Sequence, residues 1–502
     1  MKSLISSGRK IALAPVVTLA VLAFSLVFSP AFGVSHAAET LVQMSSDPFT
    51  NSSSQHQTEV EPDAFAWGQT IVATFQQGRF TTGGASDNGW ATSFDGGASW
   101  KHGSLPGATV YSGGSSYHRA SDPVVAYDAK HHTWMISSYI FDEIANPNEI
   151  GVSLSPDGTK WSNPVTVVQN ASGVFFDKDW IGCDNTATSP YYGHCYDEWD
   201  TFYNNKNYNI IDMSTSTDGG KTWGPATPTT GNYNGTGGQI LVQPDGKVIV
   251  PILGETPKTY YEAAFTSSDG GKTWSKLVKI SGEFVLSEEP RMRTSDGLLT
   301  AAIDSSGKVY LAWNDCRFEA SCSANDIVLT TSTDGVNWTA IRRIPIDPVG
   351  SGVDHFNPGL AVRTFQGQDH IALTYYYFPN TNCTVATCQL DVGFISSANG
   401  GASWSQPEQL AGPMKLKWLA NTQGRGYFVG DYIATVIVPD DDAVPVIEVG
   451  VPPSSNGLLH EATYTTPEDA ALPLTGGLVT TQNDPVLVSQ PVSPAFPPGW
   501  SR

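Results

Sequence analysis

Acidic residues recur at matched points along the chain, each near the start of a run that alternates apolar and polar residues as a β-strand does. Arginines, a histidine and aromatic residues stand among them. Carboxylates beside arginines and aromatic rings can bind a sugar and supply a general acid–base pair. A single Asp at a strand start more often caps a turn, so the prediction depends on the recurrence. The recurring residues are Asp63, Asp122, Asp177, Asp179, Glu288, Glu289, Asp354 and Asp431, with Arg119, Arg291, Arg317, Arg425, His355, Trp180 and Tyr432.

Seven strand-like stretches carry these residues. We expect each to be the innermost strand of a repeated unit, so that the strand starts converge on one mouth. The stretches are EPDAFAWGQTIVATF from Glu61, SDPVVAYD from Ser121, FDKDWIGCD from Phe176, NGTGGQILV from Asn234, SEEPRM from Ser287, DHFNPGLAV from Asp354 and GDYIATVIV from Gly430.

A turn motif punctuates the same units at intervals of 51 to 65 residues. Its Ser and Asp can hydrogen-bond the backbone of a tight turn, its Gly takes a positive φ, and its Trp can pack back onto the sheet. A strand-like run precedes each copy, which predicts a β-hairpin turn. The copies are SFDGGASW from Ser93, SPDGTKW from Ser155, STDGGKTW from Ser216, SSDGGKTW from Ser267, STDGVNW from Ser332 and the degenerate SANGGASW from Ser397.

This period, with several short strands per unit, predicts an all-β β-propeller. Residues 40–466 divided by seven give 61 per unit, which matches the spacing, so seven blades are favoured over six. The last unit lacks its own motif, and ETLVQMSS near the N-terminus is expected to complete it. The propeller is assigned to residues 39–466, and the Pro-rich remainder, 467–502, is expected to be an extended tail.

The six motifs are Asp-boxes, also called bacterial neuraminidase repeats, and through them the chain resembles the sialidase-like superfamily. That resemblance implies an exo-glycosidase acting on terminal sugars, sialic acid or a related acidic sugar. Carried over by strand phase, Asp122 would be the acid–base, Tyr432 the nucleophile and Glu289 its partner. Arg119, Arg291 and Arg317 would hold the sugar's carboxylate. Further substrate contacts are predicted at Asp315, Asp354, His355, Trp180, Tyr376 and Asp431.

The chain also departs from the sialidase pattern. Sialidases have six blades, and their F/Y-R-I-P element is missing before the first box; Arg343-Ile344-Pro345 follows the fifth box instead. Two alternatives therefore stay open: a propeller that binds glycan or protein without catalysis, and a polysaccharide lyase. Tyr376 is assigned equally to core and site. No cofactor or metal ligand set is predicted, although an acidic ring can hold calcium.

The composition and the N-terminal residues indicate where the protein acts and which partners it can have. Lys2, Arg9 and Lys10, the apolar run Ile11 to Phe28 and the small residues after it predict a signal peptide over residues 1–38 and a secreted protein. Beyond it, 24 basic residues face 48 acidic ones, which disfavours nucleic acid and anionic membrane as partners. A monomer acting on glycan or polysaccharide is expected. In an exported chain the cysteines should pair with their nearest neighbours: Cys183–Cys195, Cys316–Cys322 and Cys383–Cys388.

Overall fold

The computed structural model describes residues 41–143, 146–170, 173–203, 209–229, 234–256, 259–288, 291–294, 297–467 and 472–488. The predicted signal peptide, Glu289 and the end of the tail lie outside these residues. The described part is built almost entirely of antiparallel strands, and it contains no helix long and apolar enough to cross a membrane. The all-β prediction is confirmed.

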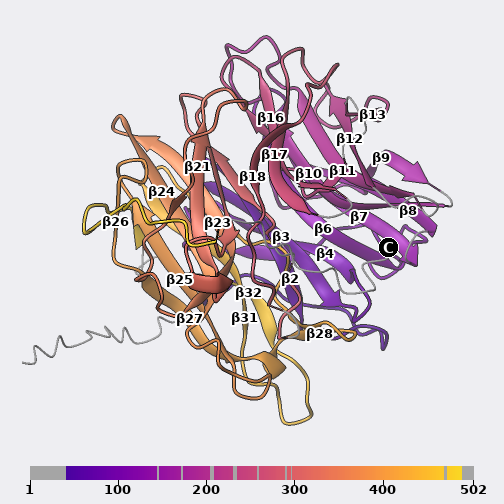
Figure 1. Cartoon of the computed structure of the whole chain (residues 1–502). Helices are drawn as coiled ribbons and strands as arrows, with labels where there is room; N and C mark the ends of the chain where they lie inside the picture. The colour runs from indigo at the N-terminus through magenta and orange to yellow at the C-terminus, as the bar shows by residue number, and fades with distance from the viewer. Residues whose placement is uncertain are drawn as a thin grey trace, which may run out of the picture. The chain divides into compact units, whose positions relative to one another are not determined.

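We divide the strands of the described chain into seven antiparallel groups, A to G (Figure 1). Groups A and B belong to one sheet, joined by the single pair Ala85–Ala120 between β4 and β6. Group A contains β2 (Glu59–Trp67), β3 (Thr70–Arg79), β4 (Ala85–Ser93) and β5 (Lys101–Ser104). Group B contains β6 (Arg119–Asp128), β7 (Thr133–Glu143), β8 (Asn146–Ser155) and β9 (Val165–Asn170). Group C contains β10 (Val174–Cys183), β11 (Cys195–Tyr203), β12 (Asn209–Ser216) and β13 (Thr227–Pro228). Group D contains β14 (Gly235–Thr236), β15 (Leu241–Val242), β16 (Val248–Glu255), β17 (Tyr260–Ser267) and β18 (Val278–Gly282).

The second half of the chain repeats the pattern. Group E contains β19 (Thr300–Ile303), β20 (Val309–Asp315), β21 (Asp326–Ser332) and β22 (Arg342–Arg343), with a 3-10 turn at Ala320–Cys322. Group F contains β23 (Asp354–Phe365), β24 (Gln368–Phe378), β25 (Gln389–Ser397) and β27 (Glu408–Lys415), followed by a 3-10 turn at Leu416–Trp418. Group G contains β30 (Ala434–Ile437), β31 (Asp442–Gly450), β32 (Glu461–Thr465) and β1 (Val42–Gln43). Short pairs are made by β26 (Ser403–Trp404) with β34 (Val479–Thr480), by β28 (Ala420–Thr422) with β29 (Gly426–Phe428), and by β33 (Leu472–Pro473) with β31.

The innermost strands of the groups, which are the first strands except that group D contributes its second strand β15, contact one another in a cycle: β2, β6, β10, β15, β19, β23, β30 and back to β2. Val42 and Gln43 of β1 pair with Thr465 and Tyr464 of β32, so the predicted N-terminal strand does complete the last group. One expected inner strand is misplaced, because SEEPRM is not a strand in the described residues and the first strand of group E begins at Thr300. Met292 instead bridges Tyr427 in the β28–β29 hairpin.

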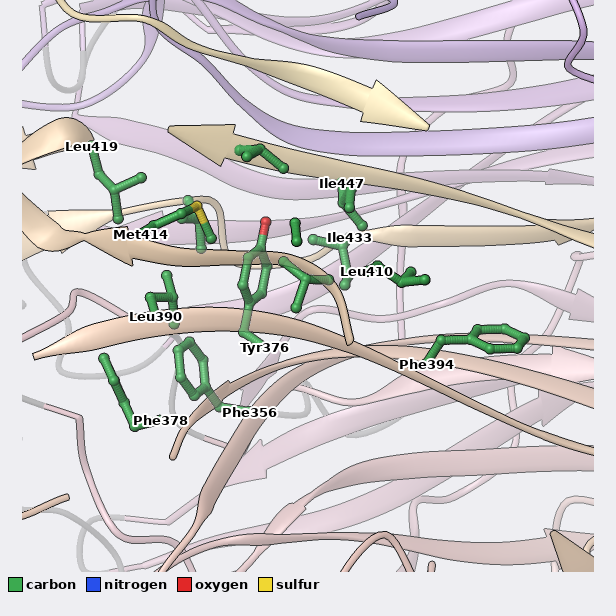
Figure 2. Packing of buried hydrophobic residues seen from close by; sticks show 14 of the residues in the cluster. Phe356, Tyr376, Phe378, Leu390, Phe394, Leu410, Met414, Leu419, Ile433 and Ile447 are labelled. Carbon is green, nitrogen blue, oxygen red and sulfur yellow. The ribbon is translucent and has the colours of Figure 1, made fainter. Parts of the chain in front are cut away.

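Apolar side chains pack between neighbouring groups rather than on one face of each. The buried cluster in Figure 2 includes Tyr376, Leu390 and Phe394 of group F together with Ile447 of group G. Comparable cores lie between C and D and between E and F. Both faces of each sheet are therefore buried, which explains strands such as VIVPILGE that are apolar on both sides.

The Asp-boxes are hairpin turns, as predicted, and each joins the last two strands of its group. In the fourth box the Ser267 hydroxyl donates to Asp269 Oδ1 at 2.9 Å, and Asp269 accepts from the Thr273 N–H at 2.9 Å. Gly271 has a φ of +82°, and a Cβ there would lie 2.5 Å from Thr215 Oγ1 of the preceding group. Each box therefore contacts the preceding group. A residue larger than glycine at the contact would collide with that group.

All three predicted disulfides are present: Cys183–Cys195, Cys316–Cys322 and Cys383–Cys388. The tail is extended in residues 472–488 but lies against the strands. It pairs with β31 and β26, and the Leu487 N–H donates to the Arg317 carbonyl at 2.8 Å. The tail therefore crosses groups G, F and E.

Candidate functional site

Strand direction determines which residues can meet. In an antiparallel meander the first strand starts, the second strand ends and the third strand starts at the same end of the sheet, and the Asp-box turn lies at the opposite end. The predicted acidic residues therefore share an end with the last residues of β3, β7 and β11.

A bulge in the first strand re-aims one side chain in four of the groups. The register shifts at Val60/Asp63, Ser121/Val124, Asp177/Trp180 and Phe356/Gly359. The bulges contain residues with positive φ: Glu61 at 57°, Asp122 at 47°, Lys178 at 50° and Asn357 at 45°. Such conformations cost about 1–3 kcal/mol each and concentrate at functional sites. Proline follows three of these residues and removes a ladder donor where the pairing shifts.

A cavity of about 350 Å³ opens at this end of groups A, B and C. Its floor is buried, with Glu61, Asp122 and Asp431 between 2% and 4% exposed. Its rim is exposed at Thr82 and Gln423. The lining residues are Glu61, Arg79, Thr81, Thr82, Gly83, Gly84, Ser121, Asp122, Tyr139, Phe141, Phe175, Asp177, Phe202, Arg293, Thr422, Gln423, Arg425 and Asp431.

Alternating charges hold the floor together. Lys178 Nζ lies 3.0 Å from Asp431 Oδ2 and 3.5 Å from Asp122 Oδ1. Arg293 Nη2 lies 3.0 Å from the same Asp431 oxygen, and Arg293 Nη1 lies 4.0 Å from Glu61 Oε1.

The carboxyl groups on the cavity floor differ in pKa. Burial, reinforced by the charge of Asp122, raises the pKa of Glu61 to about 8. Burial and then Asp122 also raise the pKa of Asp177 to about 7. Lys178 opposes both shifts, and its own pKa is raised because the attraction of Asp431 and Asp122 outweighs its burial. The cavity therefore contains carboxyl groups that can hold a proton near neutral pH.

Aromatic rings form one wall of the cavity. Phe175 and Phe202 stack with centroids 4.5 Å apart and planes 3° apart, and Tyr139 and Phe141 stack at 4.4 Å. Phe202 is partly exposed. Flat apolar faces opposite a charged floor suit a ring that is apolar on one face and hydroxylated at its edges.

Three predicted site residues lie together here. Asp122 and Asp431 line the cavity, and Tyr432 lies beneath it, 6% exposed. The Tyr432 hydroxyl donates to the Pro123 carbonyl at 3.3 Å, and Lys178 Nζ lies 4.8 Å from the centre of its ring. Burial raises the pKa of Tyr432 well above its usual value. Trp180 packs edge-on against Tyr432 at 5.7 Å and is not among the lining residues.

The three predicted clamp arginines do not converge. Arg119 stacks on Phe80 at 4.5 Å and donates to the Gly83 carbonyl. Arg291 pairs with Glu288 at 3.1 Å, and Arg317 pairs with Asp315 at 2.5 Å. The arginines that line the cavity are Arg79, Arg293 and Arg425.

Arg79, Arg293 and Lys178 were not predicted for the site, and neither Arg79 nor Arg293 lies in a stretch predicted to be an inner strand. Arg79 ends a second strand, and that position was the available signal. Arg293 arrives on the segment that bridges the β28–β29 hairpin. Lys178 lies between Asp177 and Asp179, and no pattern in the sequence indicates that its side chain pairs with the carboxylates of the cavity floor.

The remaining predicted residues lie elsewhere at the same end. Asp354 Oδ1 accepts from the Asn325 N–H at 2.8 Å, and His355 contacts Tyr375. Asp315 accepts from Trp313 Nε1 at 3.0 Å. Tyr376 is fully buried between groups F and G, with no exposed surface to offer a sugar (Figure 2).

Comparison with known proteins supports the resemblance that the Asp-boxes indicate. Residues 146–359 match the BNR repeat-like domain. The chain therefore resembles the Asp-box, sialidase-like propellers in sequence. No curated protein matches the chain.

Several solved structures are similar at low identity. A Hadza microbial sialidase shares 14% identity over 70% of this chain and 66% of its own, with a TM-score of 0.45. This chain thus spans slightly less than two thirds of that sialidase. An α-L-arabinofuranosidase from Fusarium graminearum shares 12% over 71% of this chain and 98% of its own, with a TM-score of 0.44. An α-L-arabinanase from Penicillium chrysogenum shares 13% over 67% and 93%, with a TM-score of 0.44.

Proposed function

We propose that this protein is a secreted, monomeric, seven-bladed propeller acting as an exo-glycosidase on terminal sugars of glycans. The seven strand groups and the cyclic contacts of their innermost strands support seven blades. Three disulfides agree with an exported protein. The observation that carries the activity is the cavity, where carboxyls of unequal proton affinity face an aromatic wall.

In this proposal Asp177 is the general acid and Asp122 is the second catalytic carboxyl group. Asp177 is only partly buried and lines the cavity, so its proton can reach a glycosidic oxygen. Its pKa of about 7 keeps much of it protonated at neutral pH. Asp122 stays beside the ammonium of Lys178, where it can stabilise positive charge developing on the sugar or activate water.

Tyr432 is less suited to the nucleophile's role that the sialidase resemblance assigns it. Its hydroxyl is committed to the Pro123 carbonyl, and Lys178 lies over its ring. We assign it to positioning Lys178 instead. Among the cavity residues, Asp122 and Asp177 are thus the groups placed for chemistry.

The favoured substrate carries a carboxylate, as sialic acid and uronic acids do. Arg79, Arg293 and Arg425 line the same cavity as the acids. The raised pKa values of Glu61 and Asp177 reduce the negative charge that these two lining carboxyls carry near neutral pH, whereas the three arginines keep theirs. The floor would therefore attract an anionic sugar, and arginine offers the paired donors that a carboxylate accepts.

The test is hydrolysis of fluorogenic glycosides, comparing a sialoside and a glucuronide with neutral arabinofuranoside and glucoside. We expect an acidic glycoside to be cleaved, and Asp177→Asn and Asp122→Asn each to lower kcat/KM by about 10²–10⁴-fold. Asp142→Asn is the matched control, because Asp142 is outside the cavity lining and pairs with His118. Turnover that survives in both cavity variants would refute the residue assignment.

Failure to cleave any glycoside would refute the enzyme and leave two alternatives. A glycan-binding propeller would retain sugar binding that Phe202→Ala weakens, since the aromatic wall would still serve. A polysaccharide lyase would instead release unsaturated uronate from a polymer, which absorbs in the ultraviolet. Either result would replace the glycosidase proposal.

A further inference from the structure

A second cluster of ligand-type side chains lies at the same end of groups E and F, apart from the cavity. Asp326 begins β21, His355 is the second residue of β23, and Asp347 lies between β22 and β23. One ligand atom from each lies within 4.8 Å of the others. We propose that Asp326, Asp347 and His355 bind a divalent first-row transition metal ion, for which Zn²⁺ is the probe.

His355 is oriented as a metal ligand. It is 1% exposed, and its Nδ1 lies 3.1 Å from the Asn325 carbonyl oxygen. Only a protonated Nδ1 can donate to that carbonyl, so Nε2 keeps its lone pair. The same arrangement, with one ring nitrogen bonded to a backbone carbonyl, fixes the tautomer of many metal-binding histidines. Tyr375 and Tyr377 hold the ring at centroid distances of 5.5 and 6.1 Å.

Asp326 has a buried oxygen without a protein partner. The residue is 3% exposed, and its Oδ1 lies 3.2 Å from Arg343 Nη1. Its Oδ2 has no hydrogen-bond partner among the described residues. Leaving a carboxylate oxygen unsatisfied in a buried setting is costly, so a ligand at Oδ2 would remove that cost.

The cluster carries an excess of negative charge, which a bound cation would reduce. Arg343 is the cation in contact, with Nη1 3.4 Å from Asp347 Oδ1 and Nε 3.1 Å from Asp484 Oδ2. One guanidinium thus faces three carboxylates, counting Asp326. Glu319 adds a fourth negative charge, and it is 3% exposed. A divalent ion would bring this group close to neutrality.

The donor set favours a transition ion over calcium. Imidazole with carboxylates suits zinc and its neighbours, whereas calcium takes six to eight oxygens. Zinc bonds of about 2.0–2.2 Å require ligand atoms roughly 3.4 Å apart. The three side chains must therefore move slightly closer together when the ion binds. Water would take the fourth position. No thiolate competes, because all six cysteines are in disulfides.

A metal here would join three segments. The Gly350 N–H donates to Glu319 Oε1 at 2.8 Å, so the loop holding Asp347 already contacts the Cys316–Cys322 loop. The tail reaches the same place through Asp484. Binding should therefore raise the melting temperature of the whole protein by mass action.

The experiment uses the full mature chain, purified without a histidine tag and stripped with EDTA. We expect one Zn²⁺ per chain by elemental analysis and calorimetry, with a raised melting temperature. Mn²⁺ should bind more weakly, in the usual order of divalent affinities, and Ca²⁺ should not compete. Asp326→Asn and His355→Gln should each weaken zinc binding at least ~100-fold, since each loses a direct ligand.

His118→Gln is the matched control, because His118 is an exposed histidine paired with Asp142 and should leave zinc binding unchanged. If Asp326→Asn misfolds, His355→Gln and the visible spectrum of the Co²⁺-loaded protein decide, since that spectrum reports nitrogen ligation directly. Zinc bound equally by His355→Gln, no stoichiometric zinc in the wild type, or preference for Ca²⁺ would each overturn the proposal.

Discussion

Replacing Tyr376 by phenylalanine removes one oxygen from the core between groups F and G. The Tyr376 hydroxyl donates to the Glu448 carbonyl at 2.8 Å and accepts from the Glu448 N–H at 3.0 Å. The paired part of β30 ends at Ala434, opposite Val446, so Glu448 lies just beyond it on β31. The hydroxyl therefore continues the ladder where the neighbouring strand stops.

The magnitude follows from what Tyr376→Phe leaves behind. The ring is unchanged, so no cavity the size of a side chain forms. Two buried backbone groups of Glu448 lose their partner, and each such loss costs about 1–3 kcal/mol. Allowing for water to reach one of them, we expect the free energy of unfolding to fall by about 2–4 kcal/mol.

Urea unfolding monitored by tryptophan fluorescence measures this change, with activity assayed in parallel. Tyr377→Phe is the matched control: Tyr377 is the next residue on the strand and is partly exposed. It should change stability by less than about 0.5 kcal/mol. kcat/KM should stay at the wild-type level in both variants.

Two results would refute the reasoning. A loss below about 0.5 kcal/mol for Tyr376→Phe would mean that the Glu448 backbone finds other partners. A fall in kcat/KM with unchanged stability would mean that Tyr376 serves the site, as the sequence also allowed.

Two other perturbations have signs that the structure predicts. Burial, reinforced by Glu59 and Glu461, raises the pKa of Glu448 well above its usual value. The folded state thus binds a proton that the unfolded state releases above about pH 4.5, so this group's contribution to stability falls as pH rises. Glu448→Gln should therefore stabilise the protein more at pH 8 than at pH 5, and equal effects in urea melts at the two values would contradict this. Turnover should fall as pH rises through about 7, where Asp177 loses its proton; a kcat/KM profile flat to pH 9 would argue against Asp177 as the acid.

The fold was largely predictable because the signals were periodic and local. The residue types of the box from Ser267 predict a hairpin turn, and the spacing between its copies gives the repeat length. Cys316 and Cys322 stand so close in sequence that pairing within one loop was the simple choice. The start of group E was misplaced because the acidic SEEPRM resembles other strand starts, whereas Arg293 on that segment crosses to the cavity.

The site was less predictable because it depends on contacts between distant elements. Proline follows Glu61 and Asp122 at two of the bulges. Lys178 also lies in a bulge, but no proline follows it. Arg79 reaches the floor from the end of a second strand, which sequence alone does not distinguish from a rim position. Tyr376 was ambiguous because both faces of a blade are buried, so alternation along the strand does not reveal which face meets a ligand.

Among the described strands β1 comes first in the chain, and it pairs with β32 of the last group. Val42 can pair only once Thr465 has been made, and bringing these two distant segments together costs about 5 kcal/mol of closure entropy. A chain interrupted before Glu461 would leave one edge of β31 without its partner, open to strands from other molecules. The sheet of group G can therefore assemble in full only after the chain has been made as far as β32.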